Sequence, residues 1–225
     1  MNLAEEALRT GGSPDRANRP AFLTANGPVS NAQFQRMVAG VACDLIAAGI
    51  MPRDRVMLRM TNSIEFATAF LGVIWVGGVP VLQNSQFGES ELRHVASLSQ
   101  PAAVLYGLEH DTIDMELDFL RYTKALLVDG DGLRTVARER VSNAEPHAGK
   151  AFDASADSDA FIVFTSGTTG KPKGVVHAHR WLTALGDSNR ARVPPKADDV
   201  VRATRGGGAS ASSAEMAAVR LASVE

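Results

Sequence analysis

The residues best suited to chemistry in this chain lie in one short segment, residues 161–177, which reads FIVFTSGTTGKPKGVVH. Its first four residues form an apolar run typical of a buried strand, and hydroxyl-bearing residues, glycines and lysines follow. No Asp or Glu occurs within residues 160–186, whereas Lys171, Lys173 and Arg180 do. Glycines let backbone N–H groups approach phosphate oxygens, hydroxyls add donors, and lysine supplies a compact positive charge. The segment therefore indicates a binding site for a polyanion.

Two common phosphate-binding patterns do not fit this loop. A Walker A loop has four residues between its first Gly and a Gly-Lys pair, which Ser or Thr follows. Here the position five before Gly170 is Thr165, and Lys171 is followed by Pro172. The dinucleotide fingerprint G-x-G-x-x-G does not occur in the chain. The structural alternative to a phosphate site is a glycine-rich surface hairpin whose lysines are solvated.

Ten consecutive positions, residues 165–174 (TSGTTGKPKG), resemble the phosphate-loop signature of the AMP-forming adenylating enzymes. That family includes acyl-CoA synthetases, peptide-synthetase adenylation domains and luciferases. Softer matches on either side, over residues 20–200, are similar to the first part of the family's large N-terminal domain. The resemblance implies a role in an AMP-forming acyl-CoA synthetase, with a peptide-synthetase adenylation domain as its sister alternative.

The resemblance also implies the chemistry and the partners. A carboxylic acid attacks the α-phosphate of ATP, which is bound with Mg²⁺, and forms an acyl-adenylate and pyrophosphate. The thiol of coenzyme A then displaces AMP to give a thioester. No His, Cys and Asp cluster in the sequence has metal-ligand spacing, so a protein-held zinc is not expected.

Individual site residues follow from the same resemblance, position by position. Pro172 is expected to stiffen the turn, and Gly174 is expected to serve geometry. His179 matches a histidine that lies near the acyl substrate in this family, and a capping or core histidine at a helix start is its structural alternative. His177 is expected to be structural. The implied phosphate contacts are Thr165, Ser166, Gly167, Thr168, Thr169, Gly170, Lys171 and Lys173.

Elements that must position this loop can be located by apolar spacing. Alternating strands and helices predict an α/β fold, in which a mostly parallel sheet is flanked by helices and ligands bind beyond the carboxyl ends of the strands. Asn26-Gly27 predicts a hairpin, and the stretch 145–158 reads as a linker. Helices are expected at 3–9, 31–48, 64–76, 89–98, 111–122, 133–141 and 179–192. Strands are expected at 55–60, 79–82, 102–106, 125–128 and 161–164, with a further one at Val175-Val176.

Composition sets wider limits. The chain has 225 residues, 45% of them hydrophobic, and a formal charge of −2, which suffices for a core and gives no indication of nucleic-acid binding. No apolar run approaches the roughly 20 residues of a membrane span. The first ten residues lack the apolar core of an export signal, so a cytoplasmic protein is expected. Cys43 has no partner for a disulfide within the chain and is expected to be a small core residue.

The composition changes near the end of the chain. Residues 205–214, RGGGASASSA, contain no apolar residue larger than alanine. We therefore expect a truncated AMP-binding (adenylation) domain over 1–201 and an irregular tail over 202–225, with a reading-frame slip near 201–205 as the hypothesis. Neither Tyr-Gly-x-Thr-Glu nor Thr-Gly-Asp, motifs of the resembled family, occurs. The alternative function is a catalytically inactive remnant that at most binds phosphate or a partner. An ordinary P-loop NTPase is a third hypothesis, which the motif spacing disfavours.

Overall fold

A computed structural model describes residues 2–9, 12–24, 26–84, 86–107, 123–129, 132–135, 141, 149–165, 170–181, 184 and 188. Its helices are α1 (Leu3–Arg9), α2 (Asn31–Ala47), α3 (Ile64–Trp75) and α4 (Glu89–Ser99). Its strands are β1 (Pro20–Thr24), β2 (Gly27–Ser30), β3 (Arg55–Arg59), β4 (Val79–Leu82), β5 (Ala103–Tyr106), β6 (Lys124–Asp129), β7 (Gly132–Thr135), β8 (Asp159–Thr165) and β9 (Lys173–Ala178).

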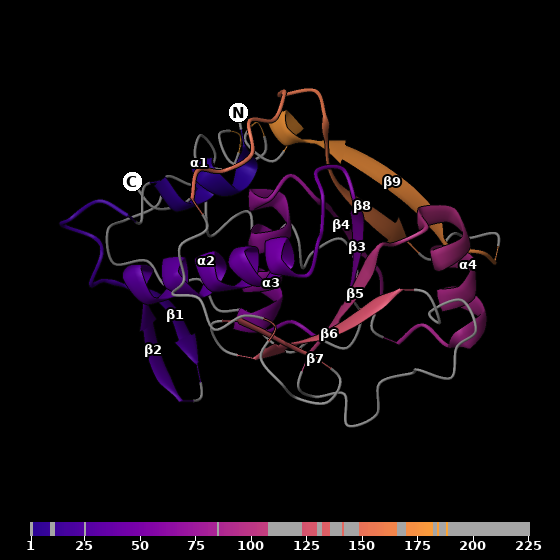
Figure 1. Cartoon of the computed structure of the whole chain (residues 1–225), viewed down its shortest axis with the longest axis horizontal. Helices are drawn as coiled ribbons and strands as arrows, with labels where there is room; N and C mark the ends of the chain where they lie inside the picture. The colour runs from indigo at the N-terminus through magenta and orange to yellow at the C-terminus, as the bar shows by residue number, and fades with distance from the viewer. Residues whose placement is uncertain are drawn as a thin grey trace.

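Seven of the described strands form one sheet in the order β7-β6-β5-β3-β4-β8-β9 (Figure 1). The five inner strands, from β6 to β8, run parallel, and the outer strands β7 and β9 run antiparallel to their neighbours. The predicted α/β class with a mostly parallel sheet is thus confirmed. Because parallel strands end at the same edge, the ends of β3, β4 and β8 lie together there.

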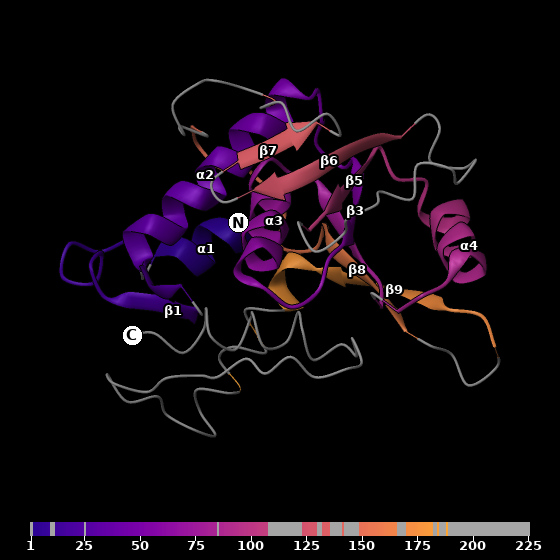
Figure 2. The ribbon, with the colours of Figure 1, turned by 90° about the horizontal axis from the view of Figure 1, so that it is seen from below.

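Helices cover both faces of this sheet. Figures 1 and 2 show α1, α2 and α3 on one side and α4 on the other. Side chains alternate between the two faces, so Val56 and Leu58 of β3 join the core under α2 and α3, while Met57 joins the core under α4. Helix α3 is buried along most of its length, as its apolar residues on all sides predict.

The two long helices begin at residues that the sequence indicated. The Ser30 side chain accepts a hydrogen bond from the Gln33 N–H, and the Gln33 side chain binds the Ser30 N–H in return, which completes a capping box. Ser63 caps α3 by accepting from the Phe66 N–H. Pro80 is the second residue of the inner strand β4, and the pairing with β8 begins only at the next residue. Its missing N–H therefore interrupts no bond to β8.

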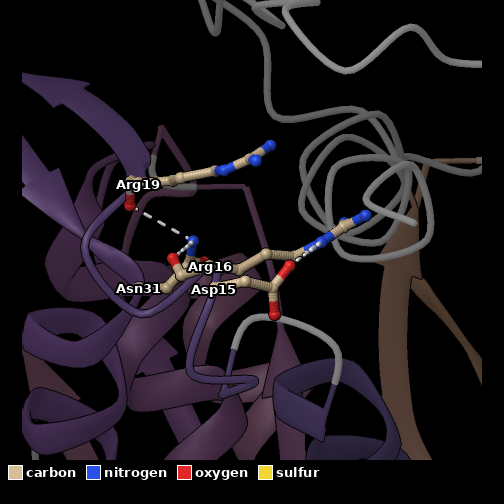
Figure 3. Close-up of polar contacts among 4 residues, drawn as sticks. All are labelled: Asp15, Arg16, Arg19 and Asn31. Atoms are coloured by element: carbon tan, nitrogen blue, oxygen red, sulfur yellow. Dashed lines mark hydrogen bonds and ion pairs between the residues drawn. The ribbon is translucent and has the colours of Figure 1, made fainter.

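Polar contacts hold the segment before β1 against the start of α2 (Figure 3). The Asn31 side-chain amide donates to the carbonyl oxygens of Arg16 and Arg19, at 3.0 and 3.2 Å. The Ser13 hydroxyl and the Asp15 backbone amide hydrogen-bond to the exposed Asp15 carboxylate and lower its pKa, and the charges of Arg16 and Arg19 lower it further. Because Asp15 is exposed, its pairing with Arg16 at 3.9 Å stabilises the fold little.

The predicted helix over 133–141 is wrong at its start, where Gly132–Thr135 form β7. Strand β7 pairs antiparallel with β6, and the Leu133 N–H donates to the Asp44 carboxylate at 2.6 Å. These long-range contacts outweigh local helix preference. Residues 136–140 and the expected helix 111–122 lie outside the described residues. Cys43, expected in the core, is half-buried on α2.

Candidate functional site

The glycine- and lysine-rich loop connects the last parallel strand to an antiparallel edge strand. Strand β8 ends at Thr165, β9 begins at Lys173, and the Cα atoms of these two residues are register partners. The loop over 166–172 thus begins and ends at a paired position, at the carboxyl end of the parallel strands, where ligands bind in folds of this kind. Of the predicted phosphate contacts, Ser166, Gly167, Thr168 and Thr169 lie outside the described residues.

The described part of the loop combines exposed cations with a buried anchor. Gly170 has φ +99°, in the left-handed region that favours glycine, and a Cβ built there would meet no atom within 4 Å. Lys171 and Lys173 are exposed, whereas Pro172 between them is buried. The loop therefore exposes both ammonium groups to solvent, while the buried Pro172 between them packs into the fold.

Local electrostatics favour an anion at this loop. Arg180, the third cation of the segment, forms an ion pair with Asp157 at 2.6 Å. Neither Lys171 nor Lys173 forms an ion pair with a described residue, and residues 160–186 contain no acidic residue. The register places the side chains of Thr165 and Lys173 on the same face of the hairpin, where a hydroxyl and an ammonium group can serve one ligand.

Gly174 has a geometric role at the start of β9. A Cβ on this residue would lie 3.0 Å from Phe164 Cζ and 3.3 Å from Ile162 Cγ2, closer than ordinary contacts. The absence of a side chain at this position therefore lets β9 lie close against the two apolar side chains of β8. A Cβ at this position would require the Phe164 ring or Ile162 to move by a few tenths of an ångström.

The sequence did not indicate two polar residues near the carboxyl edge of the sheet. Gln83, 7% exposed, directly follows β4 and donates its Nε2 to the Leu58 carbonyl at 3.2 Å, while its Oε1 has no partner among the described residues. His94 on α4 places its Nε2 3.0 Å from the Pro172 carbonyl oxygen. The only available signal for Gln83 was a polar residue after an apolar run, and His94 had none.

The structure places His179 in the core. It is 3% exposed, and its Nδ1 accepts a hydrogen bond from the Leu3 N–H of α1 at 3.2 Å. Burial lowers the pKa of His179 below its ordinary 6.5, and the charge of the amino terminus lowers it further. A neutral histidine that joins α1 to the end of β9 fits this geometry, and its nearness to an acyl substrate stays a prediction.

An aromatic cluster packs behind the hairpin. The His177 ring stacks on Phe161 with centroids 4.7 Å apart and meets Trp181 at 4.3 Å. Phe161 is buried and also contacts Phe70 of α3 at 5.5 Å, so the cluster joins β8 and β9 to the helical layer. These contacts agree with the structural role expected for His177 and give Trp181 a part in the same packing.

The described residues contain neither a metal-ligand cluster nor a helix suited to cross a membrane. They contain no group of three or more His, Cys, Asp or Glu side chains that could hold a metal ion. Within the same part of the chain, every helix is too short or too polar to cross a membrane.

Fold and loop together define a class: an α/β protein with a glycine- and lysine-rich loop at the carboxyl edge of its sheet. The sequence profile of the family described as AMP-binding enzyme matches residues 13–204. The chain belongs to that family.

Several relatives are CoA ligases. The chain is 35% identical over 160 residues to long-chain-fatty-acid–CoA ligase FadD13 of Mycobacterium tuberculosis, a match that covers 70% of this chain and 31% of the relative. It is 26% identical over 202 residues to 4-hydroxybenzoate–CoA/benzoate–CoA ligase of Rhodopseudomonas palustris, over 89% of this chain and 38% of the relative. The chain thus spans about a third of the length of these two curated relatives.

Solved structures show the same fold. The inhibitor-bound N-terminal domain of FACL13 from Mycobacterium tuberculosis matches with a TM-score of 0.78 and 26% identity, over 99% of this chain and 55% of that one. ATP-bound MatB from Rhodopseudomonas palustris matches with a TM-score of 0.75 and 26% identity, over 88% of this chain and 39% of that one.

Proposed function

We propose that this chain carries the phosphate loop of an AMP-forming carboxylate–CoA ligase and binds the β- and γ-phosphates of ATP. The observation that carries the proposal is the loop over 166–172, closed by paired Thr165 and Lys173 at the carboxyl edge of the sheet. Membership of the AMP-binding enzyme family and the CoA ligases among its relatives support the same reaction.

The reaction explains why the loop needs these residue types. A carboxylate displaces pyrophosphate from the α-phosphate of ATP, and negative charge builds up on the departing pyrophosphate. Backbone N–H groups, hydroxyls and the ammonium groups of Lys171 and Lys173 stabilise that charge. Donors already aimed at developing charge each contribute roughly 2.7–4 kcal/mol in well-studied enzymes.

The remaining partners follow from the same proposal. Coenzyme A supplies the thiol that displaces AMP, and Mg²⁺ arrives with ATP as the counter-ion of its phosphates. The described residues form no cluster of metal ligands, so we assign none of them to Mg²⁺. We also propose a cytoplasmic location, where ATP and coenzyme A are available.

A second candidate function is phosphate binding without turnover. The observation that favours it is the pair of exposed cations Lys171 and Lys173, which can attract phosphate without any carboxylate. Under this proposal the chain binds ATP or pyrophosphate, and no carboxylate becomes adenylated.

One pair of measurements separates the two candidates. Calorimetry with ATP and with pyrophosphate tests binding, and ATP–pyrophosphate exchange with a panel of aliphatic and aromatic carboxylates tests turnover. Exchange supports the ligase, and binding without exchange supports the second candidate. ATP hydrolysis without any carboxylate would instead indicate an NTPase. Absence of binding refutes both candidates.

A matched pair of lysine variants tests whether pyrophosphate binding depends on the loop. Lys173→Ala removes an exposed cation of the loop, and Lys150→Ala removes an exposed cation outside it. We expect Lys173→Ala to weaken pyrophosphate binding severalfold and Lys150→Ala to leave it unchanged. Equal effects of the two variants would show only general attraction of a polyanion to positive charge.

A further inference from the structure

A contact between distant segments fixes the second half of the phosphate loop. The Nε2 atom of His94, on α4, lies 3.0 Å from the carbonyl oxygen of Pro172, 78 positions along the chain. A carbonyl oxygen only accepts hydrogen bonds, so His94 must carry its proton on Nε2 and donate. The contact is partly buried, which shields it from competing water.

Packing of helix α4 against the sheet holds the backbone of His94 in place. Leu92, Val95 and Ala96 are buried against the face of the sheet that also carries Phe164 of β8. The ring of His94 therefore projects from a helix that the core holds in place on both sides of it. The Ser97 hydroxyl binds the His94 carbonyl and leaves the imidazole unaffected.

Pro172 is the position where the hydrogen bond from His94 meets the described part of the loop. It is buried between exposed Lys171 and Lys173, and its ring fixes its own φ. Its carbonyl belongs to the peptide unit that also contains the Lys173 N–H, so the direction of the carbonyl sets the orientation of that unit. On the other side, Gly170 has φ +99°, and its Cβ position is open.

We propose that His94 is a positioning residue, which holds the loop through Pro172 so that Lys171 and Lys173 meet the phosphate chain of ATP together. The inference rests on the proposed function, because it assumes that the loop binds phosphates. His94 itself touches no substrate. Its effect on affinity comes from keeping the loop in its binding conformation before the ligand arrives.

Three substitutions of His94 in the full chain separate the hydrogen bond from the bulk of the side chain. His94→Phe keeps a ring and removes the donor, His94→Gln places an amide N–H near the original Nε2, and His94→Ala removes both. Ser97→Ala, which changes an exposed hydroxyl one turn along α4, is the matched control. Calorimetric affinity for pyrophosphate and for ATP is the readout, with a thermal melt of each variant to verify folding.

We expect His94→Phe and His94→Ala to bind pyrophosphate threefold to tenfold more weakly, and His94→Gln and Ser97→Ala to bind within twofold of the unsubstituted chain. Hydrogen exchange of the amides in residues 170–178 should also be faster in His94→Phe than in His94→Gln. A general structural defect would weaken both of these variants alike.

The results distinguish failure of this inference from failure of the function. If the unsubstituted chain binds neither pyrophosphate nor ATP, the proposed function and this inference both fall. If it binds and His94→Phe binds equally well, only the inference falls. A folded His94→Gln that is as weak as His94→Phe also overturns it, because the donor would not be the cause. Should His94→Ala fail to fold, the other two variants carry the comparison.

Discussion

Replacing His179 tests the buried link between the first helix and the end of β9. The Leu3 N–H is at the start of α1, and Nδ1 of His179 is the acceptor that the structure gives it, at 3.2 Å. His179→Ala leaves this N–H in the core without its acceptor. His179→Asn keeps an acceptor, because the Asn Oδ1 occupies nearly the place of Nδ1, and it removes the titrating ring.

The size of the effect follows from burial. An unsatisfied buried donor costs about 1–3 kcal/mol, and His179 is 3% exposed. We therefore expect His179→Ala to lower the free energy of unfolding by about 2 kcal/mol or more, since the lost ring packing adds to the unpaired N–H. His179→Asn, which loses mainly packing, should lower it by less.

The pH dependence has a definite sign. Burial first, and the amino-terminal charge second, lower the pKa of His179 in the folded chain below 6.5. Above pH 6.5 the ring is neutral in both states and costs nothing. As the pH falls below 6.5, the unfolded chain takes up a proton that the folded chain does not, so stability decreases by up to about 1.4 kcal/mol per pH unit until the folded pKa is reached.

Urea unfolding between pH 5 and 8, followed by tryptophan fluorescence, measures both effects, because Trp181, near His179 in the chain, belongs to the aromatic cluster. The unsubstituted chain should lose stability between pH 6.5 and 5, and His179→Asn should lose less over the same range. An identical pH slope in the two proteins would refute the assignment. So would a His179→Ala variant as stable at pH 8 as the unsubstituted chain.

Three further outcomes are expected. Asp44→Ala should cost about 1–3 kcal/mol in chemical denaturation, because the Leu133 N–H loses its carboxylate acceptor, and Asp44→Asn should cost less. Gly77→Ala should cost about 1–3 kcal/mol by the same measurement, since φ is +81° and a Cβ would lie 2.6 Å from the Phe152 ring. Val176, 53% exposed on the edge strand β9, should favour association between chains, so Val176→Lys should reduce light scattering without changing the melting temperature.

Each of these has a result that would contradict it. An Asp44→Ala chain as stable as the unsubstituted one would mean that Leu133 finds another acceptor. Gly27, whose φ is +109° with no atom within 4 Å of a Cβ, is the control for Gly77, since Gly27→Ala has only the backbone cost. Equal losses at the two glycines would show that the Phe152 ring simply moves aside. Unchanged scattering after Val176→Lys would place the association elsewhere.

Elements with local signals were predicted well. The helix expected at 31–48 is Asn31–Ala47, and that expected at 64–76 is Ile64–Trp75, because a serine cap and apolar spacing are properties of the segment itself. Strand β7 was missed because its stability comes from β6 and from Asp44, which lies 89 residues away along the chain.

The candidate site likewise contains residues that the sequence could indicate and residues that it could not. The loop between Thr165 and Gly174 is a contiguous pattern and could be identified from its letters, and its place at the carboxyl edge followed from alternating strands and helices. His94 and Gln83 could not be identified from the sequence, because each acquires its partner only when separate strands and helices pack together. A core position was the structural alternative expected for His179, and its buried contact with Leu3 was not foreseen, since it joins distant ends of the described chain.

That contact also sets an order of events during synthesis on the ribosome. Helix α1 is attached through Asn2 to the carbonyl oxygens of Ile74 and Phe152, and through Leu3 to His179, which is made 176 residues later. At about 5–20 residues per second, α1 waits roughly 9–35 s for its last anchor. The last hydrogen bond of α1 therefore forms only after residue 179 has been made, long after its contact with Ile74 becomes possible.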